Sequence, residues 1–131
     1  FRNIHLGMDF WTKAGTPIFA PLKGEVHSFQ ANQGAGNSGP TIILYHPAEK
    51  IYSLYGHLAE QDLEGLSVGM PIAEGQMLCH LGEPNENGGW PPHLHFQLIR
   101  DMQGYTGDYP GVCSKRDLAF YAGNCPDPAT F

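Results

Sequence analysis

Apolar residues occur along this chain in short runs that alternate with polar residues and are interrupted by glycine or proline. Helical periodicity never continues for more than about ten residues, and the apolar runs are rich in β-branched and aromatic side chains. This pattern predicts short strands joined by turns. We expect strands over residues 16–21, 24–30, 41–47, 50–58 and 93–99, and a further pair of strands within 68–82.

The connections between these strands favour antiparallel pairing. Residues 41–47 and 50–58 flank a short turn and predict a hairpin, and the pair within 68–82 is expected to turn at Glu74 and Gly75. Residues 31–40 form a glycine-rich loop, and 59–66 is the best candidate for a short helical turn. After Arg100 the chain is expected to be mostly loop. The predicted fold class is all-β, with mainly antiparallel sheets.

The length and charge of the chain narrow its class further. With 131 residues, 41% of them hydrophobic, the chain can form one domain over 1–131 with a modest core. The net charge of −6 comes from scattered acidic residues without a basic stripe, so a nucleic-acid partner is not expected. The apolar run 41–45 is far shorter than the roughly 20 residues that a membrane helix needs.

Three cysteines, Cys79, Cys113 and Cys125, contain no CxxC pair. This spacing argues against a zinc knuckle or a dense disulfide framework. A bridge between Cys113 and Cys125 is a candidate, and the sequence leaves the redox state of all three open.

Two histidines, His93 and His95, share one predicted strand. Alternate residues of a strand point to the same face, so the two imidazoles are expected about 7 Å apart on one side of the sheet. His5 and Asp9 have the same parity in an extended segment near the start of the chain. Imidazole nitrogen and carboxylate oxygen are zinc donors, and three protein ligands with a fourth position open are typical of a catalytic site. His5, Asp9 and one histidine of the pair could form such a set.

A proton-transfer group would complete a hydrolytic site. His57 ends the predicted strand 50–58, where a side chain can face a cleft, and imidazole is suited to exchange protons near neutral pH. The other histidines lack a motif, and we expect surface or strand-face positions for His27, His46 and His80. Aromatic residues that could line a groove, but that more often belong to a core, are Trp11, Trp90, Tyr52 and Tyr55.

Over residues 3–99 the chain resembles the lysostaphin-type (LytM-like) zinc metalloendopeptidases. The segments that carry the resemblance are "HLGMDF", "AGTPIFAPLKGEV", "YGHL", "GMPIAEGQ" and "PPHLHFQL". The resemblance implies that one Zn²⁺ per chain is bound by His5, Asp9 and His95. It also implies that His57 and His93 flank the zinc-activated water and act in catalysis.

The resemblance further implies antiparallel sheets with a groove, of the duplicated hybrid motif type, and hydrolysis of peptide bonds in peptidoglycan cross-bridges or stem peptides. One alternative is a non-catalytic metal-binding or activator module on the same scaffold, and another is a peptidase-like module with a substrate outside the cell wall. A phosphocarrier with paired histidines is a third alternative, and Asp9 argues against it.

Several features depart from the common pattern of this family. The HxH strand is entered through "NGGWPP" rather than small residues, and Gln97 stands where glutamate is frequent. Residues 100–131 form an extension that resembles the variant module found in long chains with a class III aminotransferase, which implies covalently linked domains. Family members often place a tyrosine upstream of the first ligand, and the sequence leaves open whether a segment precedes Phe1. The resemblance suggests the periplasm or cell wall, and the variant tail leaves a cytoplasmic location open.

Overall fold

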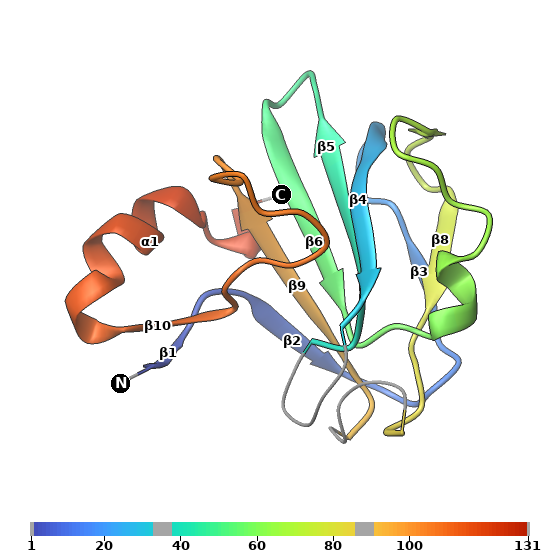
Figure 1. Ribbon diagram of the computed structural model, residues 1–131, viewed down its shortest axis with the longest axis horizontal. Coiled ribbons are helices and arrows are strands. Elements are labelled where there is room, and N and C mark those ends of the chain that lie inside the picture. Colours follow the sequence, from blue (N-terminus) through green and yellow to red (C-terminus); the bar gives the residue numbers. More distant parts are fainter. Residues whose placement is uncertain (1, 33–37, 86–90, 131) are drawn as a thin grey trace.

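The computed structural model describes residues 2–32, 38–85 and 91–130, and within them the main feature is a six-stranded antiparallel sheet (Figure 1). The strands lie side by side in the order β2 (Met8–Trp11), β9 (His93–Ile99), β6 (Ile51–Gly56), β5 (Pro40–His46), β4 (Gly24–Ala31) and β7 (Pro71–Ile72). The all-β prediction is confirmed. Strands β5 and β6 form the predicted hairpin, in which Ile42 lies opposite Tyr55 and His46 opposite Ile51.

Two small sheets flank the large one. Strand β1 (Arg2–His5) pairs with β10 (Val112–Ser114), and β3 (Pro17–Phe19) pairs with β8 (Met77–His80). The helical elements are the 3₁₀ helices η1 (Glu60–Leu63), η2 (Lys115–Asp117) and η3 (Pro128–Thr130), and the helix α1 (Leu118–Asn124). The helical turn predicted over 59–66 is therefore present as η1.

The two strands predicted within 68–82 exist, but they do not pair with each other. β7 pairs with β4 and β8 with β3, so the chain changes sheets at the turn. Gly75 has a φ of 78°, as the predicted turn requires, and its amide donates to the carbonyl of Ala20. The amide of Ala20 in turn donates to the carbonyl of Gln76. The turn is thus bonded to the end of β3, and turn chemistry alone does not reveal this partner.

The expectation of a mostly loop-like chain after Arg100 is wrong in part, because β10, η2, α1 and η3 lie there. Helix α1 has seven residues, and its Leu118 and Phe120 are exposed, so it lacks the apolar stripe by which a sequence predicts a helix. Its last residue, Asn124, accepts from the Arg100 amide through its carbonyl and donates through its side chain to the Asp101 carbonyl. These bonds join the helix to the end of β9.

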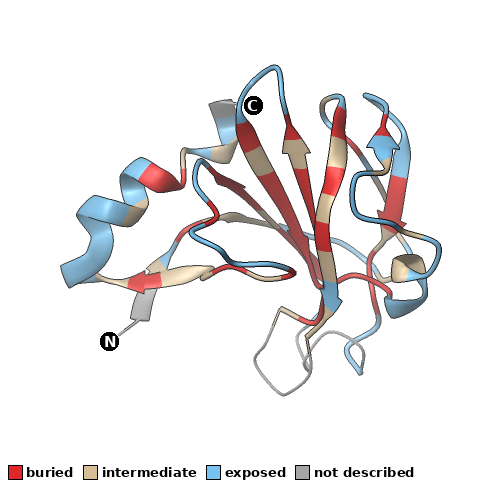
Figure 2. Cartoon of the chain, turned by 45° about the horizontal axis from the view of Figure 1, so that its top comes forward, coloured by how far each residue is buried: buried red, intermediate tan, exposed pale blue. Residues whose placement is uncertain are grey.

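Apolar side chains cover both faces of the large sheet and form two core clusters. In Figure 2 many of the buried residues lie along the strands of this sheet. Successive side chains of a strand point to opposite faces, so Ile42 and Leu44 of β5 enter one cluster and Ile43 enters the other. Burial on both faces explains why β5 is apolar without alternation. Residues of the C-terminal segment that join the second cluster are Met102, Tyr109, Cys113 and Cys125.

The three cysteines, His46 and Tyr55 all lie in the interior of the fold. All three cysteines are buried free thiols, so the candidate bridge between Cys113 and Cys125 is absent. His46 lies on a strand as expected, but it is fully buried and contacts the Lys23 carbonyl and the Ser53 hydroxyl. Tyr55 belongs to the core.

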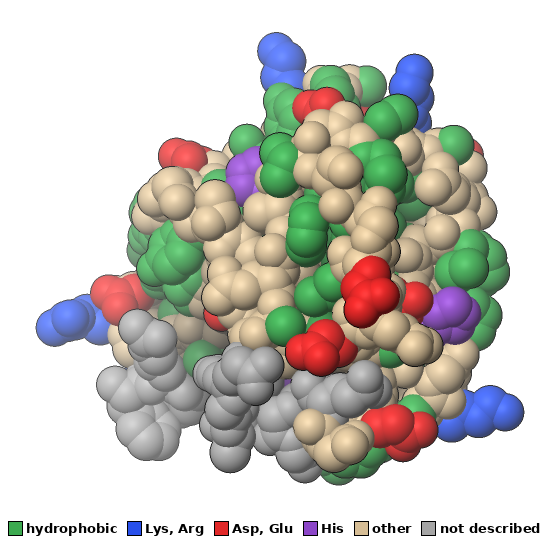
Figure 3. Space-filling view, turned by 45° about the vertical axis from the view of Figure 1, so that its right-hand side comes forward, with side chains coloured by type: hydrophobic (Ala, Val, Ile, Leu, Met, Phe, Trp, Pro, Cys, Tyr) green, Lys and Arg blue, Asp and Glu red, His purple; other side chains and the backbone are tan. Residues whose placement is uncertain are grey.

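In the view of Figure 3, several acidic side chains lie on the visible face of the described residues. The lysine and arginine side chains lie at the outline of the molecule. None of the described helices is long and apolar enough to cross a membrane.

Candidate functional site

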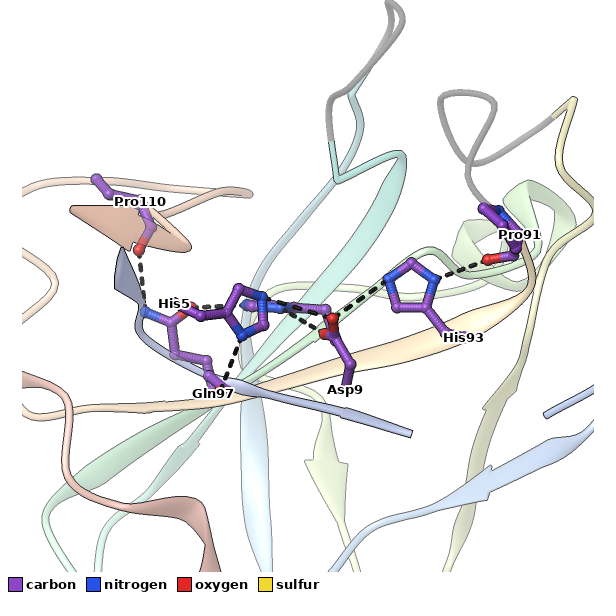
Figure 4. Close-up of polar contacts among 8 residues, drawn as sticks. His5, Asp9, Pro91, His93, Gln97 and Pro110 are labelled. Carbon is purple, nitrogen blue, oxygen red and sulfur yellow. Dashed lines mark hydrogen bonds and ion pairs between the residues drawn. The ribbon is translucent and has the colours of Figure 1, made fainter. Parts of the chain in front are cut away.

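The pairing of β2 with β9 brings the two halves of the predicted site together. Asp9 lies directly opposite His95, and Trp11 lies opposite His93. Paired residues of antiparallel strands point to the same face, so Asp9 and both histidines share one side of the sheet. His5 ends β1, and a bend at Gly7, whose carbonyl contacts His5 Nδ1, leads into β2. In Figure 4, His5 and His93 lie on opposite sides of Asp9.

The three residues predicted as metal ligands form one compact group. Donor atoms of His5, Asp9 and His95 all lie within 4.8 Å of one another. His5 Nε2 is 3.6 Å from Asp9 Oδ2, and His95 Nδ1 is 3.2 Å from Asp9 Oδ1. Gly7 permits this approach, because a Cβ at that position would lie 2.8 Å from the ring of His95. The predicted residues are thus close enough together to share one ion.

The Asp9 carboxyl is the electrostatic centre of this group. Partial burial raises its pKa, but the hydrogen bond with His95 and the positive charge of His5, His95 and His93 outweigh burial, so the pKa lies below its ordinary value. Asp9 is therefore an ionised acceptor among imidazoles.

Each of the three imidazoles around Asp9 has one ring nitrogen that faces away from the carboxylate, and this outer nitrogen donates its N–H to an oxygen that can only accept. His5 Nδ1 is 3.2 Å from the Gly7 carbonyl, and His93 Nδ1 is 2.7 Å from the Pro91 carbonyl. His95 Nε2 is 2.8 Å from Gln97 Oε1. In all three rings the other nitrogen faces Asp9: with a proton it is attracted to the carboxylate, and without one it offers its lone pair to a bound metal ion.

His93 is held between two other rings. The indole of Trp11 stacks on it with ring centroids 4.2 Å apart, and the centroid of His57 lies 4.2 Å away. His93 Nε2 lies 3.9 Å from Asp9 Oδ2, so its inner nitrogen is directed at the same centre as the metal-ligand candidates. Three side chains therefore fix the position of one imidazole.

His57 follows β6 in a conformation that non-glycine residues seldom adopt, with a φ of 66°. Its amide donates to the Ser38 carbonyl at 2.7 Å, and its carbonyl accepts from the Gly82 amide at 3.0 Å. These two bonds hold the strained backbone and direct the ring towards His93.

The donor set fits a zinc ion. Two imidazole nitrogens and one carboxylate oxygen are normal zinc ligands, and the outer N–H of each histidine has the acceptor that ligating histidines usually require.

This arrangement of residues agrees with a known family. The sequence profile of peptidase family M23 matches residues 3–106. The chain belongs to peptidase family M23. The matched range contains His5, Asp9, His57, His93 and His95.

Three curated bacterial proteins are similar to this M23 chain. It is 30% identical over 113 residues to an uncharacterized metalloprotease of Haemophilus influenzae, 27% over 105 residues to an L-Ala–D-Glu endopeptidase of Bacillus subtilis, and 30% over 110 residues to lysostaphin of Staphylococcus staphylolyticus. These matches cover 84%, 76% and 82% of this chain. They cover only 22%, 31% and 21% of the relatives, so the chain corresponds to a fraction of each.

Solved structures show the same fold. The catalytic domain of lysostaphin from Staphylococcus simulans has a TM-score of 0.57 at 23% identity, with 89% of this chain and 78% of that chain covered. A zinc-containing peptidase from Vibrio cholerae has a TM-score of 0.56 at 25% identity, with 73% and 27% covered.

The structure adds residues that the sequence did not assign to the site. Gln97 contacts His95, and Trp11, expected more often in a core, is 63% exposed beside His93. Burial raises the pKa of Asp108, whose carboxyl also interacts with Ser38 and with the charge of His95. No motif marked these contacts, because each depends on tertiary structure. Trp90, another predicted groove residue, lies outside the described residues.

Proposed function

We propose that this chain is the catalytic domain of a zinc-dependent endopeptidase that hydrolyses peptide bonds in peptidoglycan. The observation that carries the proposal is that three imidazoles direct their inner nitrogens at the Asp9 carboxylate. Family membership and the similarity to lysostaphin and to an L-Ala–D-Glu endopeptidase support the peptidase activity and its substrate class. The zinc-containing structural neighbour supports the choice of metal.

In this proposal His5 Nε2, the Asp9 carboxylate and His95 Nδ1 hold one zinc ion. Bound zinc would supply a Lewis acid that activates water and polarises the scissile carbonyl. The exposed side of His5 leaves an approach for a substrate peptide, whereas His95 is buried against the sheet.

His93 and His57 move protons in this reaction. His93 accepts a proton at Nε2, because its Nδ1–H is held by the Pro91 carbonyl. His57, packed against His93, stabilises the charge that develops on the substrate and assists protonation of the leaving amine. Trp11 keeps His93 in place through ring stacking.

The peptide bond itself is proposed only as a class, a cross-bridge or stem-peptide bond. The segment before β9 departs from the family pattern and would bear on this choice. Linkage to other domains, including the aminotransferase arrangement that the extension resembles, stays a prediction.

The test is metal analysis of the purified chain, combined with digestion of purified peptidoglycan and of an oligoglycine peptide by the same sample. We expect one zinc per chain and release of new amino termini, lost after chelation and restored by zinc. Zinc without cleavage of either substrate would favour a non-catalytic metal-binding module or a substrate outside the cell wall. Absence of zinc binding would contradict the proposal.

A further inference from the structure

The C-terminal segment 107–130 lies beyond the range that the family profile matches, yet it reaches the candidate metal centre. Gln97 Nε2 donates to the Pro110 carbonyl at 3.0 Å and to the Cys125 sulfur at 3.4 Å. Its Oε1 accepts from His95 Nε2 at 2.8 Å. One amide thus joins a candidate zinc ligand to a segment that the family pattern does not include (Figure 4).

The orientation of this amide is determined by its partners. Gln97 is completely buried, and the Pro110 carbonyl can only accept a hydrogen bond, so the NH₂ group of Gln97 must face the C-terminal segment. The oxygen of Gln97 is then directed at His95. That contact keeps a proton on His95 Nε2 and directs Nδ1 at Asp9, so that Nδ1 could present its lone pair to a bound zinc ion.

This geometry also gives a physical reason for glutamine at position 97. A carboxylate could accept from His95, but it could not donate to the Pro110 carbonyl and would place two acceptors against each other in a buried site. Glutamine supplies an acceptor on one side and donors on the other.

The same segment contacts the first ligand as well. The Leu6 amide donates to the Gly111 carbonyl at 2.8 Å, and His5 pairs with Val112 between β1 and β10. A Cβ at Gly111 would lie 3.2 Å from His95 Nε2. Two of the three candidate ligands are therefore packed against residues 110–112.

We propose that the C-terminal segment 107–130 is a positioning element of the metal centre, which acts through Gln97 on His95 and through β10 on His5. This inference rests on the proposed function, because it assumes that His5 and His95 bind zinc. It goes further by assigning a role in zinc affinity to residues outside the family match. Gln97 is a positioning residue here, since it acts through His95.

Two substitutions test the inference from opposite ends of the contact. Gln97→Leu removes both the acceptor for His95 and the donors to the segment, and Gly111→Ala adds one methyl group against His95 Nε2. Gly123→Ala is the matched control, because a Cβ there meets no atom within 4 Å. Zinc affinity is measured by competition with a chelator of known affinity, and the melting temperature of the zinc-free protein reports folding.

We expect Gln97→Leu to weaken zinc binding about 10- to 100-fold, the range typical for loss of a group that orients a ligand. Gly111→Ala should weaken it about tenfold or less, and Gly123→Ala should bind like the parent. The absorption spectrum of the cobalt-substituted protein should change in the first two variants only, which a purely structural role would not require.

The outcomes separate this inference from the function on which it rests. A parent chain that binds no zinc overturns both. A parent that binds zinc, with folded Gln97→Leu and Gly111→Ala variants of equal zinc affinity and cobalt spectrum, overturns the inference alone. If one of the two variants does not fold, the other decides by the same comparison with Gly123→Ala.

Discussion

The indole of Trp11 lies against the imidazole of His93, with ring centroids 4.2 Å apart and planes 28° from parallel. Trp11 is 63% exposed, whereas His93 is only 3% exposed. An exposed aromatic ring therefore covers one face of a buried imidazole, and the ring of His57 packs against that imidazole as well. This packing restrains His93 at the start of β9, where β2 pairs with it but the register with β6 already ends at His95.

Trp11→Ala should reduce turnover more than metal binding. Loss of the stacked ring lets His93 move, and a misplaced proton-transfer group would lower kcat by about tenfold, a part of the 10²- to 10⁴-fold that such a group contributes. Steady-state hydrolysis of peptidoglycan and zinc content measure the two effects separately.

Phe10→Ala is the matched control for this prediction. Phe10 is an exposed aromatic residue on the same strand, and it points to the opposite face. Equal losses of kcat in both variants would show that the stacking with His93 has no particular role.

The zinc affinity of the chain should fall as the pH is lowered from neutral. The lowered pKa of Asp9 keeps its carboxylate ionised in this range, so the loss reflects competition between protons and zinc for the imidazole nitrogens. Zinc release against pH, followed with an indicator dye, measures this. Affinity that is constant from about pH 7 to pH 5 would contradict histidine ligation.

Asp9 should also contribute to folding stability with a defined pH dependence. A carboxyl whose pKa is lower in the folded state stabilises the fold above its unfolded pKa, and this stability is lost as the pH falls through the folded pKa. In the zinc-free parent, the free energy of unfolding should therefore rise from strongly acidic to mildly acidic pH as Asp9 ionises. The Asp9→Asn variant should lack this part of the rise. Urea denaturation across that range measures the difference.

The three thiols should be unreactive in the native protein at neutral pH. All are buried, and burial raises the pKa of the Cys79 and Cys125 thiols, so these two remain protonated. Ellman's reagent should detect almost no thiol in the folded chain and three per chain after unfolding. Detection of only one after unfolding, without reductant, would indicate a disulfide between two of the three cysteines and contradict the free thiols of the structure.

The buried contacts of Ser53 should stabilise the sheet without affecting the metal. Its hydroxyl lies 2.7 Å from both His46 Nε2 and the Tyr55 hydroxyl. Ser53→Ala should lower the free energy of unfolding by about 1–3 kcal/mol, because both groups lose a buried partner. The exposed Ser67→Ala should change it little. A large loss of zinc affinity in Ser53→Ala would show that this network and the metal centre are coupled.

The strands could be predicted because they depend on local signals, and the group of His5, Asp9 and His95 could be predicted because its motifs resemble those of a known family. The parity of an HxH strand and an ordered series of family motifs are visible in the sequence. The β2–β9 register then places Asp9 opposite His95. The metal-binding and catalytic roles of these residues stay predictions.

Other features depend on contacts between distant segments that no local signal encodes. The bond between Gln97 and Cys125 spans 28 residues, and helix α1 lacks an apolar stripe because its large apolar residues Leu118 and Phe120 are exposed. β8 pairs with β3 beside the hydrogen bonds of Gly75 and Gln76 to Ala20, and β7 pairs with β4, so neither partner follows from the turn between the two strands. Local sequence patterns therefore reveal neither the elements of the C-terminal extension nor its contacts with the candidate site.

The central claim is tested most directly by the zinc content of three histidine variants beside the parent. His95→Ala removes a proposed ligand, His57→Ala removes a proposed catalytic group, and His27→Ala is a control on β4, where the ring contacts Ser28 rather than the candidate metal centre. We expect one zinc per chain in the parent, His57→Ala and His27→Ala, and almost none in His95→Ala. Peptidoglycan hydrolysis should persist only in the parent and His27→Ala, with a loss of about 10²- to 10⁴-fold in His57→Ala. If His95→Ala binds zinc as tightly as the parent, the assigned metal centre is wrong.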